Sequence, residues 1–281
     1  MFVQKLYSLA EMVPKTSGRL DTANSKPDNM HKKGEKTMGA KQAEKLAAMI
    51  EKARCMAFFG GAGVSRESGI PDFRSTDGIY RQTWAYPPET ILSRDFFRKN
   101  PGEFYRFYKE RMIFPDALPN AAHRALARLE KTGILSGVIT QNIDGLHQAA
   151  GSCRVMELHG SVHRNFCMKC KKSFTLDEIM LQEGVPVCPC GGIIKPDVVL
   201  YGEILPSHTV KEALGTIGDC DLLVIGGTSL TVYPAAGFVY DYPGKIAIIN
   251  CSKTPMDERA DLCISAPIGE TMAAVMALLE G

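Results

Sequence analysis

Short apolar runs recur along the chain from residue 55 onwards, and segments with helical periodicity separate them. Several of these runs are apolar at every position, without alternating polar residues. That pattern is typical of strands buried on both faces of a parallel sheet. The predicted strands cover residues 55–60, 134–140, 154–158, 197–201, 221–227, 245–250 and 262–266.

The intervening segments repeat their apolar residues at helical spacing. The predicted helices cover residues 40–53, 101–112, 120–131, 206–217 and 269–280. This alternation predicts an α/β fold with a doubly wound, Rossmann-like parallel sheet. Residues 75–118, rich in aromatics, and residues 164–195, with four cysteines, interrupt the alternation. We interpret both as inserts that form a smaller domain, made of a helical module and a zinc ribbon.

The N-terminal segment is polar and rich in residues that break secondary structure. We therefore expect residues 1–38 to be a disordered leader, followed by a single catalytic domain over residues 39–281. Met38 stands just before the first predicted helix, and we hypothesise that it is the true first residue. The N-terminal mass of the endogenous protein tests this hypothesis.

Composition narrows the function classes. The 281-residue chain is 45% apolar and has a net charge of +2, which argues against a strongly basic nucleic-acid surface. No apolar run reaches the length of a membrane span, and the N-terminus lacks a secretory signal pattern. Nine cysteines, an odd number with two tight pairs, favour a metal site in a reducing compartment. We expect a cytoplasmic protein with no membrane partner and no specific nucleic-acid partner.

The segment FFGGAGVSRESGIPDFRS, residues 58–75, places glycines directly after the first predicted strand. Glycines let the backbone approach a ligand, and free amides at a helix start attract anions, which favours a phosphate-binding turn. The segment is not GxGxxG and lacks the lysine of a Walker loop. On local sequence alone, a plain strand-to-helix turn remains an equal alternative.

Polar residues also end two later strands. Gln141, Asn142 and Asp144 follow residues 134–140, and ligands bind outside such strand ends in open α/β sheets. The local alternative is a helix start capped by Asn142 or Asp144. His159 ends the next strand; an imidazole can accept and return a proton near neutral pH, although a lone histidine is more often structural.

Four cysteines stand in two close pairs, Cys167-x-x-Cys170 and Cys188-x-Cys190. Two pairs with this separation predict a tetrahedral zinc site, and four sulfur ligands leave no open position for catalysis. The zinc should therefore be structural. We interpret the other five cysteines as small core residues: Cys55, Cys153, Cys220, Cys251 and Cys263.

The glycine loop continues into a longer motif that resembles the sirtuin family, GAG-x-S-x-x-SGIP-x-FR. The resemblance extends in order over about residues 40–281. It includes TQNIDGLH (140–147), ELHGS (157–161), the cysteine pairs, VLYGE (199–203), GTSLTVYPAA (227–236) and IIN (248–250). The second cysteine pair departs from the family, which has C-x-x-C there.

The resemblance implies NAD-dependent protein lysine deacetylation that yields nicotinamide, O-acetyl-ADP-ribose and free lysine. It marks His159 as the general base and Asn142 as a second catalytic residue beside the nicotinamide ribose. Ile143 and Asp144 would accept the nicotinamide carboxamide. The implied NAD contacts are Gly61, Ala62, Gly63, Arg66, Phe73, Arg74, Gln141, Asn142, Ile143, Asp144, Gly227, Thr228, Ser229 and Asn250.

The resemblance also implies that an acyl-lysine peptide binds as a strand between residues 199–203 and 229–233. Val199, Tyr201 and Val232 would contact this substrate. We expect a neutral acyl group such as acetyl, because no arginine–tyrosine arrangement stands near Ala85 and Tyr86.

Two other functions stay open at this point. NAD-dependent ADP-ribosyl transfer to protein would use the same pocket and differ in its product. A non-enzymatic zinc-ribbon module that binds nucleic acid is disfavoured by the near-neutral charge.

Overall fold

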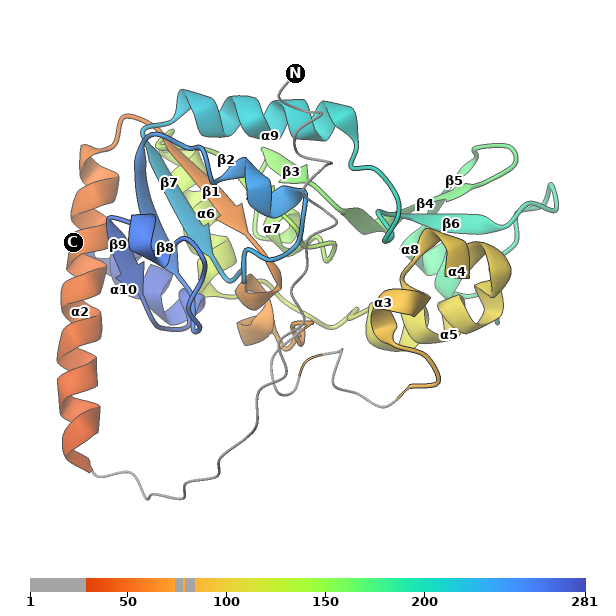
Figure 1. Ribbon diagram of the computed structural model, residues 1–281, viewed down its shortest axis with the longest axis horizontal. Helices are drawn as coiled ribbons and strands as arrows, with labels where there is room; N and C mark the ends of the chain where they lie inside the picture. The colour runs from red at the N-terminus through yellow and green to blue at the C-terminus, as the bar shows by residue number, and fades with distance from the viewer. Residues whose placement is uncertain (1–28, 74–77, 79–83) are drawn as a thin grey trace.

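The computed structural model describes residues 29–73, 78 and 84–281. Its larger part is a six-stranded sheet in the order β3-β2-β1-β7-β8-β9, and every neighbouring pair is parallel (Figure 1). The parallel sheet predicted from the apolar runs is therefore confirmed. Its strands are β1 (Met56–Gly60), β2 (Leu135–Thr140), β3 (Val155–Glu157), β7 (Leu222–Gly226), β8 (Lys245–Ile249) and β9 (Leu262–Ile264).

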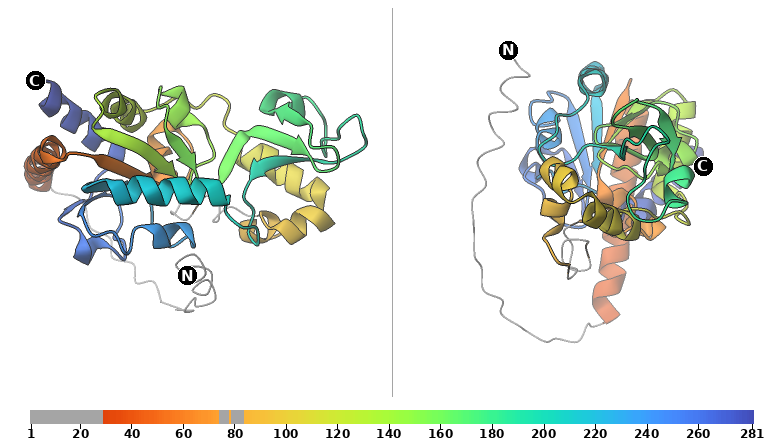
Figure 2. Two further views of the ribbon diagram at one scale, coloured as in Figure 1. Left: turned by 90° about the horizontal axis from the view of Figure 1, so that it is seen from above. Right: turned by 90° about the vertical axis from the view of Figure 1, so that its right-hand side faces the viewer.

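Helices cover both faces of this sheet, as a doubly wound fold requires. Three helices, α2 (Asn29–Lys52), α6 (Ala121–Lys131) and α10 (Ile268–Glu280), share one apolar core with the sheet. Helix α9 (Ser207–Asp219) shares a second core with the other face. Viewed from above, α9 and α6 lie on opposite sides of the strands (Figure 2). Because both faces are covered, the strands can be apolar at every position.

A second, three-stranded antiparallel sheet has the order β5-β4-β6 and lies at the right-hand end in Figure 1. Phe104, Tyr105 and other aromatic side chains of the helical insert pack in one core with residues of this sheet. Both predicted inserts thus contribute to one smaller unit. Its elements are α3 (Pro88–Ile91), α4 (Arg94–Lys99), α5 (Pro101–Arg111), β4 (Gly160–Cys167), β5 (Ser173–Thr175), α8 (Leu176–Met180) and β6 (Ile194–Val198).

Two predicted elements differ from the structure. Helix α2 begins at Asn29, so residues 29–38 of the predicted leader have helical backbone, while residues 1–28 lie outside the described residues. No proline stands between Asn29 and Lys52, and Gly34 and Gly39 weaken a helix without ending it. The strand predicted at 197–201 ends at Val198 and belongs to the smaller sheet, because β6 pairs with β4.

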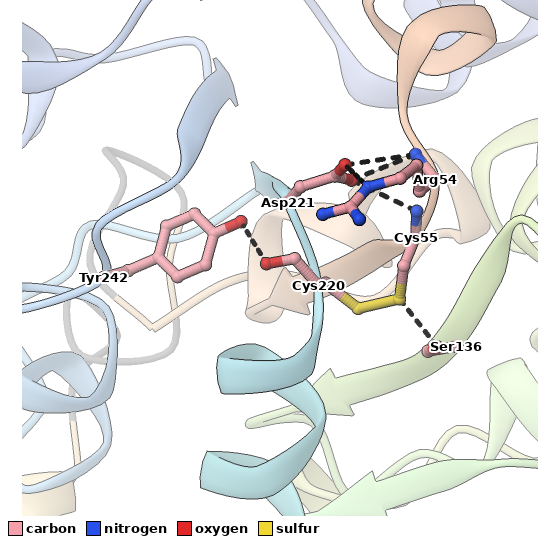
Figure 3. A network of polar contacts seen from close by, with 6 residues as sticks. All are labelled: Arg54, Cys55, Ser136, Cys220, Asp221 and Tyr242. Carbon is pink, nitrogen blue, oxygen red and sulfur yellow. Dashed lines mark hydrogen bonds and ion pairs between the residues drawn. A yellow bond between two sulfur atoms is a disulfide. The ribbon is translucent and has the colours of Figure 1, made fainter.

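The prediction that five cysteines are small core residues is wrong for three of them. Cys55, just before β1, and Cys220, just before β7, form a disulfide (Figure 3). The neighbouring Asp221 carboxylate accepts hydrogen bonds from the amides of Arg54 and Cys55. Three more are exposed, because they lie in loops or on the outward side of the edge strand β9: Cys153, Cys251 and Cys263. Of these five cysteines, Cys220 is buried and Cys55 packs half-buried against the same core.

Within the described ranges, no helix is both long and apolar enough to cross a membrane.

Candidate active site

A cavity of about 980 Å³ opens at the carboxyl ends of the parallel strands, where β1 and β7 lie side by side. From β1 the chain continues to β2 on one side, whereas β7 leads to β8 on the other. Ligands of doubly wound folds bind at such a switch point. The cavity is at the upper end of the range for ligand pockets.

Seventeen of the predicted NAD-binding, catalytic and peptide-binding residues line this one cavity, although they come from distant segments. They are Gly61, Ala62, Gly63, Arg66, Phe73, Gln141, Asn142, Ile143, Asp144, His159, Val199, Tyr201, Gly227, Thr228, Ser229, Val232 and Asn250. Arg74 was predicted with them and lies outside the described residues.

The glycine loop packs closely against the loop that follows β7. The amides of Gly61 and Gly63 donate to the carbonyls of Gly226 and Gly227, at 3.2 and 2.8 Å, so these two amides already have partners. A Cβ atom at Gly63 would lie 2.7 Å from the Gly227 Cα. The glycines therefore allow two loops to touch. The helix expected after them is replaced by two short 3₁₀ turns, at 62–64 and 66–68.

The Ser65 hydroxyl connects two predicted NAD contacts, Asn142 and Asp144. Ser65 Oγ donates to Asp144 Oδ2 at 2.6 Å and accepts from Asn142 Nδ2 at 3.0 Å. The other oxygen of Asp144 accepts from the Leu146 amide at 2.9 Å. These contacts fix the directions of the Asn142 and Asp144 side chains. Ser65 belongs to the sirtuin motif, but its partners lie 77 and 79 residues away, so only the fold identifies its role.

Two buried histidines stand close to this network. The rings of His123 and His147 are 4.7 Å apart, and neither ring nitrogen of His147 has a hydrogen-bond partner among the described residues. Burial lowers the pKa of His147 to about 3 and that of His123 to about 4. Both imidazoles are therefore neutral at pH 7.

The geometry of His159 suits a general base. Its Nδ1 lies 2.9 Å from the Gln141 carbonyl, which can only accept, so Nδ1 carries the proton and Nε2 is left as the base. Burial lowers the pKa of His159 below its ordinary value, and the contact with the Gln141 carbonyl opposes this shift. The Gln141 side chain is held in turn by Thr228 Oγ1 at 3.0 Å.

Residues 199–203 are anchored at both ends. The Val199 amide donates to the His159 carbonyl at 3.0 Å, which ties residues 199–203 to the strand end that carries His159. The Tyr201 amide donates to the Leu92 carbonyl at 2.9 Å, and the Arg94 amide donates to the Tyr201 carbonyl at 2.9 Å. Sequence reasoning missed three apolar residues that line the same cavity: Met112, Phe114 and Leu205.

The four paired cysteines form one cluster, with all sulfur atoms within 4.8 Å of one another. Cys167 and Cys190 Sγ are 3.5 Å apart, and Cys170 and Cys188 Sγ are 3.6 Å apart. Two sulfur ligands of tetrahedral zinc are about 3.8 Å apart, so the cluster fits this metal. The shorter C-x-C pair thus still reaches the cluster.

Backbone amides prepare the cluster for a cation. The amides of Lys169 and Cys170 point at Cys167 Sγ at 3.4 and 3.5 Å, a contact that favours the thiolate. Gly192 packs directly against the same sulfur, since a Cβ atom there would lie 2.6 Å from Cys167 Sγ. The donor set and its surroundings therefore suit a structural zinc ion.

Several known proteins are similar to this chain over most of its length. A family model described as "Sir2 family" matches residues 61–234. The NAD-dependent protein deacetylase of Clostridium acetobutylicum is 50% identical over 236 residues, which cover 82% of this chain and 96% of the relative.

Solved structures agree with these sequence matches. A Sir2 complex with a deacetylated p53 peptide and 3'-O-acetyl ADP ribose superposes with a TM-score of 0.79 at 39% identity, covering 84% of this chain and 98% of the other. "Sir2 bound to acetylated peptide" superposes with a TM-score of 0.76 at 38% identity, with coverages of 84% and 97%.

Proposed function

Because this chain belongs to the Sir2 family, we propose that it is an NAD-dependent protein lysine deacetylase that releases nicotinamide, O-acetyl-ADP-ribose and free lysine. The observation that carries this proposal is the single cavity. This cavity brings together the glycine loop after β1, the loop after β7 and residues 199–203. His159 lines the same cavity. A similar Sir2 protein has been solved with an acetylated peptide, which supports an acyl-lysine substrate.

The roles of the side chains follow from their chemistry. NAD would supply the reactive C1' carbon, which the acyl oxygen attacks as nicotinamide leaves, and a ribose hydroxyl for the second step. We propose that Ile143 and Asp144 hold the carboxamide while Gln141 and Asn142 bind along the ribose. His159 Nε2 would then take the proton of the ribose hydroxyl that attacks the acyl carbon.

Cys167, Cys170, Cys188 and Cys190 would hold the zinc ion, which supplies no chemistry to the reaction. A site with four thiolates has no open position for water or substrate. The cluster instead fixes the turns between β4 and β6.

Replacement of the base is the direct test. We expect His159→Ala to retain the fold and zinc and to lose NAD-dependent deacetylation by at least about a hundredfold, since a positioned acid–base group contributes about 10²–10⁴-fold. His208→Ala, at an exposed position in the first turn of α9, is the matched control. Release of nicotinamide and O-acetyl-ADP-ribose is measured by mass spectrometry. Full activity of the His159 variant would rule out this role.

The pH dependence adds a second test of His159. A base acts when it is unprotonated, so kcat/KM should fall as the pH drops through the pKa of His159. Burial lowers this pKa, so the acid limb should have its midpoint below the ordinary value of about 6.5. A midpoint at or above pH 7 in the wild type would contradict the assignment.

We further propose that the acyl group is neutral. Arg111 lines the cavity, but its guanidinium pairs with Glu110 at 2.8 Å, which compensates its charge. Acetyl-lysine peptides should therefore be turned over faster than succinyl-lysine peptides of the same sequence. The same incubations test ADP-ribosyl transfer, since that reaction yields a modified protein and no O-acetyl-ADP-ribose.

We propose a cytoplasmic location, supported by the four clustered thiols. The Cys55–Cys220 disulfide opposes it, because disulfides are rare in reducing compartments. Cell fractionation, with thiol counting on protein trapped directly in the cell, tests both points.

A further inference from the structure

A buried cation lies beside residues 199–203, the first of the two loops expected to bind the peptide, which we call the peptide-side loop. Lys195, on β6, has only 7% of its surface exposed, although no step of the proposed reaction uses it. A buried lysine needs compensation for its charge and partners for its three N–H donors. The role of Lys195 should therefore be sought in the groups that its ammonium contacts.

All three donors of Lys195 have partners, two in the segment before residues 199–203 and one at the end of these residues. Lys195 Nζ lies 2.8 Å from the Val198 carbonyl and 3.2 Å from the Pro196 carbonyl. It also lies 3.1 Å from Glu203 Oε2, an ion pair whose carboxylate side chain is 24% exposed. The ammonium thus joins the start of the loop to its far end.

Glu203 closes the loop on itself. Its Oε2 atom accepts from the Leu200 amide at 2.9 Å, and its own amide donates to the Leu200 carbonyl at 2.9 Å. Residues 199–203 are consequently held as a tight turn. Val199 and Tyr201, which face the cavity, lie within it.

We propose that Lys195 and Glu203 form a clasp that holds residues 199–203 in the shape that binds the acyl-lysine peptide. Lys195 is thus a positioning residue for the peptide and has no part in NAD binding. This inference rests on the proposed deacetylase function for its substrate. The geometry of the clasp itself is independent of that function.

The clasp predicts a selective kinetic defect. Lys195→Met should raise KM for an acetyl-lysine peptide by about tenfold, because the charge-assisted hydrogen bonds that hold residues 199–203 are lost. KM for NAD should stay within about twofold, since the NAD contacts come from other loops. The exposed Lys211→Met on α9 is the matched control and should leave both values unchanged.

A double-mutant cycle separates the clasp from a general packing effect. Glu203→Gln should raise KM for the peptide in the same direction. The variant with both changes should be less impaired than the sum of the two single effects, because each single change already removes the contact between Lys195 and Glu203. Additive effects, an unchanged peptide KM, or an equal rise in KM for NAD would overturn the proposal.

Hydrogen exchange makes the test independent of catalysis. In Lys195→Met, the Leu200 and Glu203 amides should lose protection, while the amides of β1 and β7 keep theirs. Unchanged protection at Leu200 and Glu203 overturns the clasp even if the wild type is fully active. A wild type that does not deacetylate any acetyl-lysine peptide overturns the proposed function instead, and the exchange result still decides the clasp.

Discussion

The two sheets of this protein are stabilised differently. The parallel sheet lies between two apolar cores, one shared with α2, α6 and α10 and one with α9. The antiparallel sheet shares a single aromatic core with the helical insert, and its far end carries the four-cysteine cluster. Hydrophobic burial can stabilise the first alone, whereas a small unit with few strands often needs a metal.

The difference also separates the two halves of the candidate site. In the larger sheet, the loops that would bind NAD touch through backbone contacts between Gly63 and Gly227, supported by the core beneath them. The peptide-side loop follows β6 of the smaller sheet and depends on the Lys195–Glu203 pair. We therefore expect damage to the smaller unit to affect peptide binding before NAD binding.

Loss of zinc should produce the largest difference between the smaller and the larger unit. Cys190→Ser should abolish zinc binding and reduce deacetylation by more than about a hundredfold, since zinc supplies about 10–16 kcal/mol in small zinc domains. Exchange protection should disappear from β4–β6 and persist in β1, β2 and β7. Metal content and hydrogen exchange measure both effects.

The control for this experiment is Cys153→Ser, which changes an exposed cysteine outside the cluster. It should keep the zinc and the activity. A Cys190 variant without zinc that retains a protected β4 and normal turnover would show that the smaller unit does not need the metal.

An aromatic deletion should have the next largest effect. Phe104→Ala removes a fully buried ring that contacts Phe97, Tyr105 and Tyr108. It should cost about 3–5 kcal/mol of the local stability of the smaller unit. Zinc release to a chelator should therefore become faster, as a colorimetric indicator can follow.

Met272→Ala, in the core on the α2, α6 and α10 side, is the matched deletion in the larger unit. It should lower the free energy of unfolding of the parallel sheet and leave zinc release unchanged. Equal zinc release from both variants would mean that the two units unfold together.

Acid should lower the free energy of unfolding of the larger unit, and the change per pH unit should be smaller than the effects above. Burial lowers the pKa of His147 to about 3 and that of His123 to about 4, so below about pH 6.5 only the unfolded chain takes up these protons. The free energy of unfolding should fall by about 1.4 kcal/mol per pH unit for each histidine, down to its folded pKa.

Urea unfolding between about pH 7 and pH 4.5, followed by fluorescence, measures this slope. In His147→Leu one of the two contributions is gone, so the slope attributable to the pair should be about half. His208→Ala, at an exposed site, should leave the slope unchanged. An unaltered slope in the His147 variant would show that this histidine is protonated in the folded protein.

Much of the fold could be predicted because strands covered on both faces must be apolar throughout. All six strands of the parallel sheet lie within predicted runs, and α5, α6, α9 and α10 match their predictions closely. The strand before Val199 was misplaced, because its partner β4 stands about thirty residues earlier and leaves no local pattern. Cys263 was misread for a related reason, since strand composition does not tell which face a side chain occupies.

By itself, the sequence determined the succession of strands and helices along the chain, the two close cysteine pairs and the residue types at the strand ends. Apolar runs, cysteine spacing and motifs are local, so they can be read along the chain. Only the tertiary structure decided that the glycine amides are already paired, that Ser65 joins Asn142 to Asp144, and that Lys195 reaches Glu203. Hydrogen bonds and charge pairs form between groups that the fold brings within about 3 Å, and their separation in sequence does not reveal them.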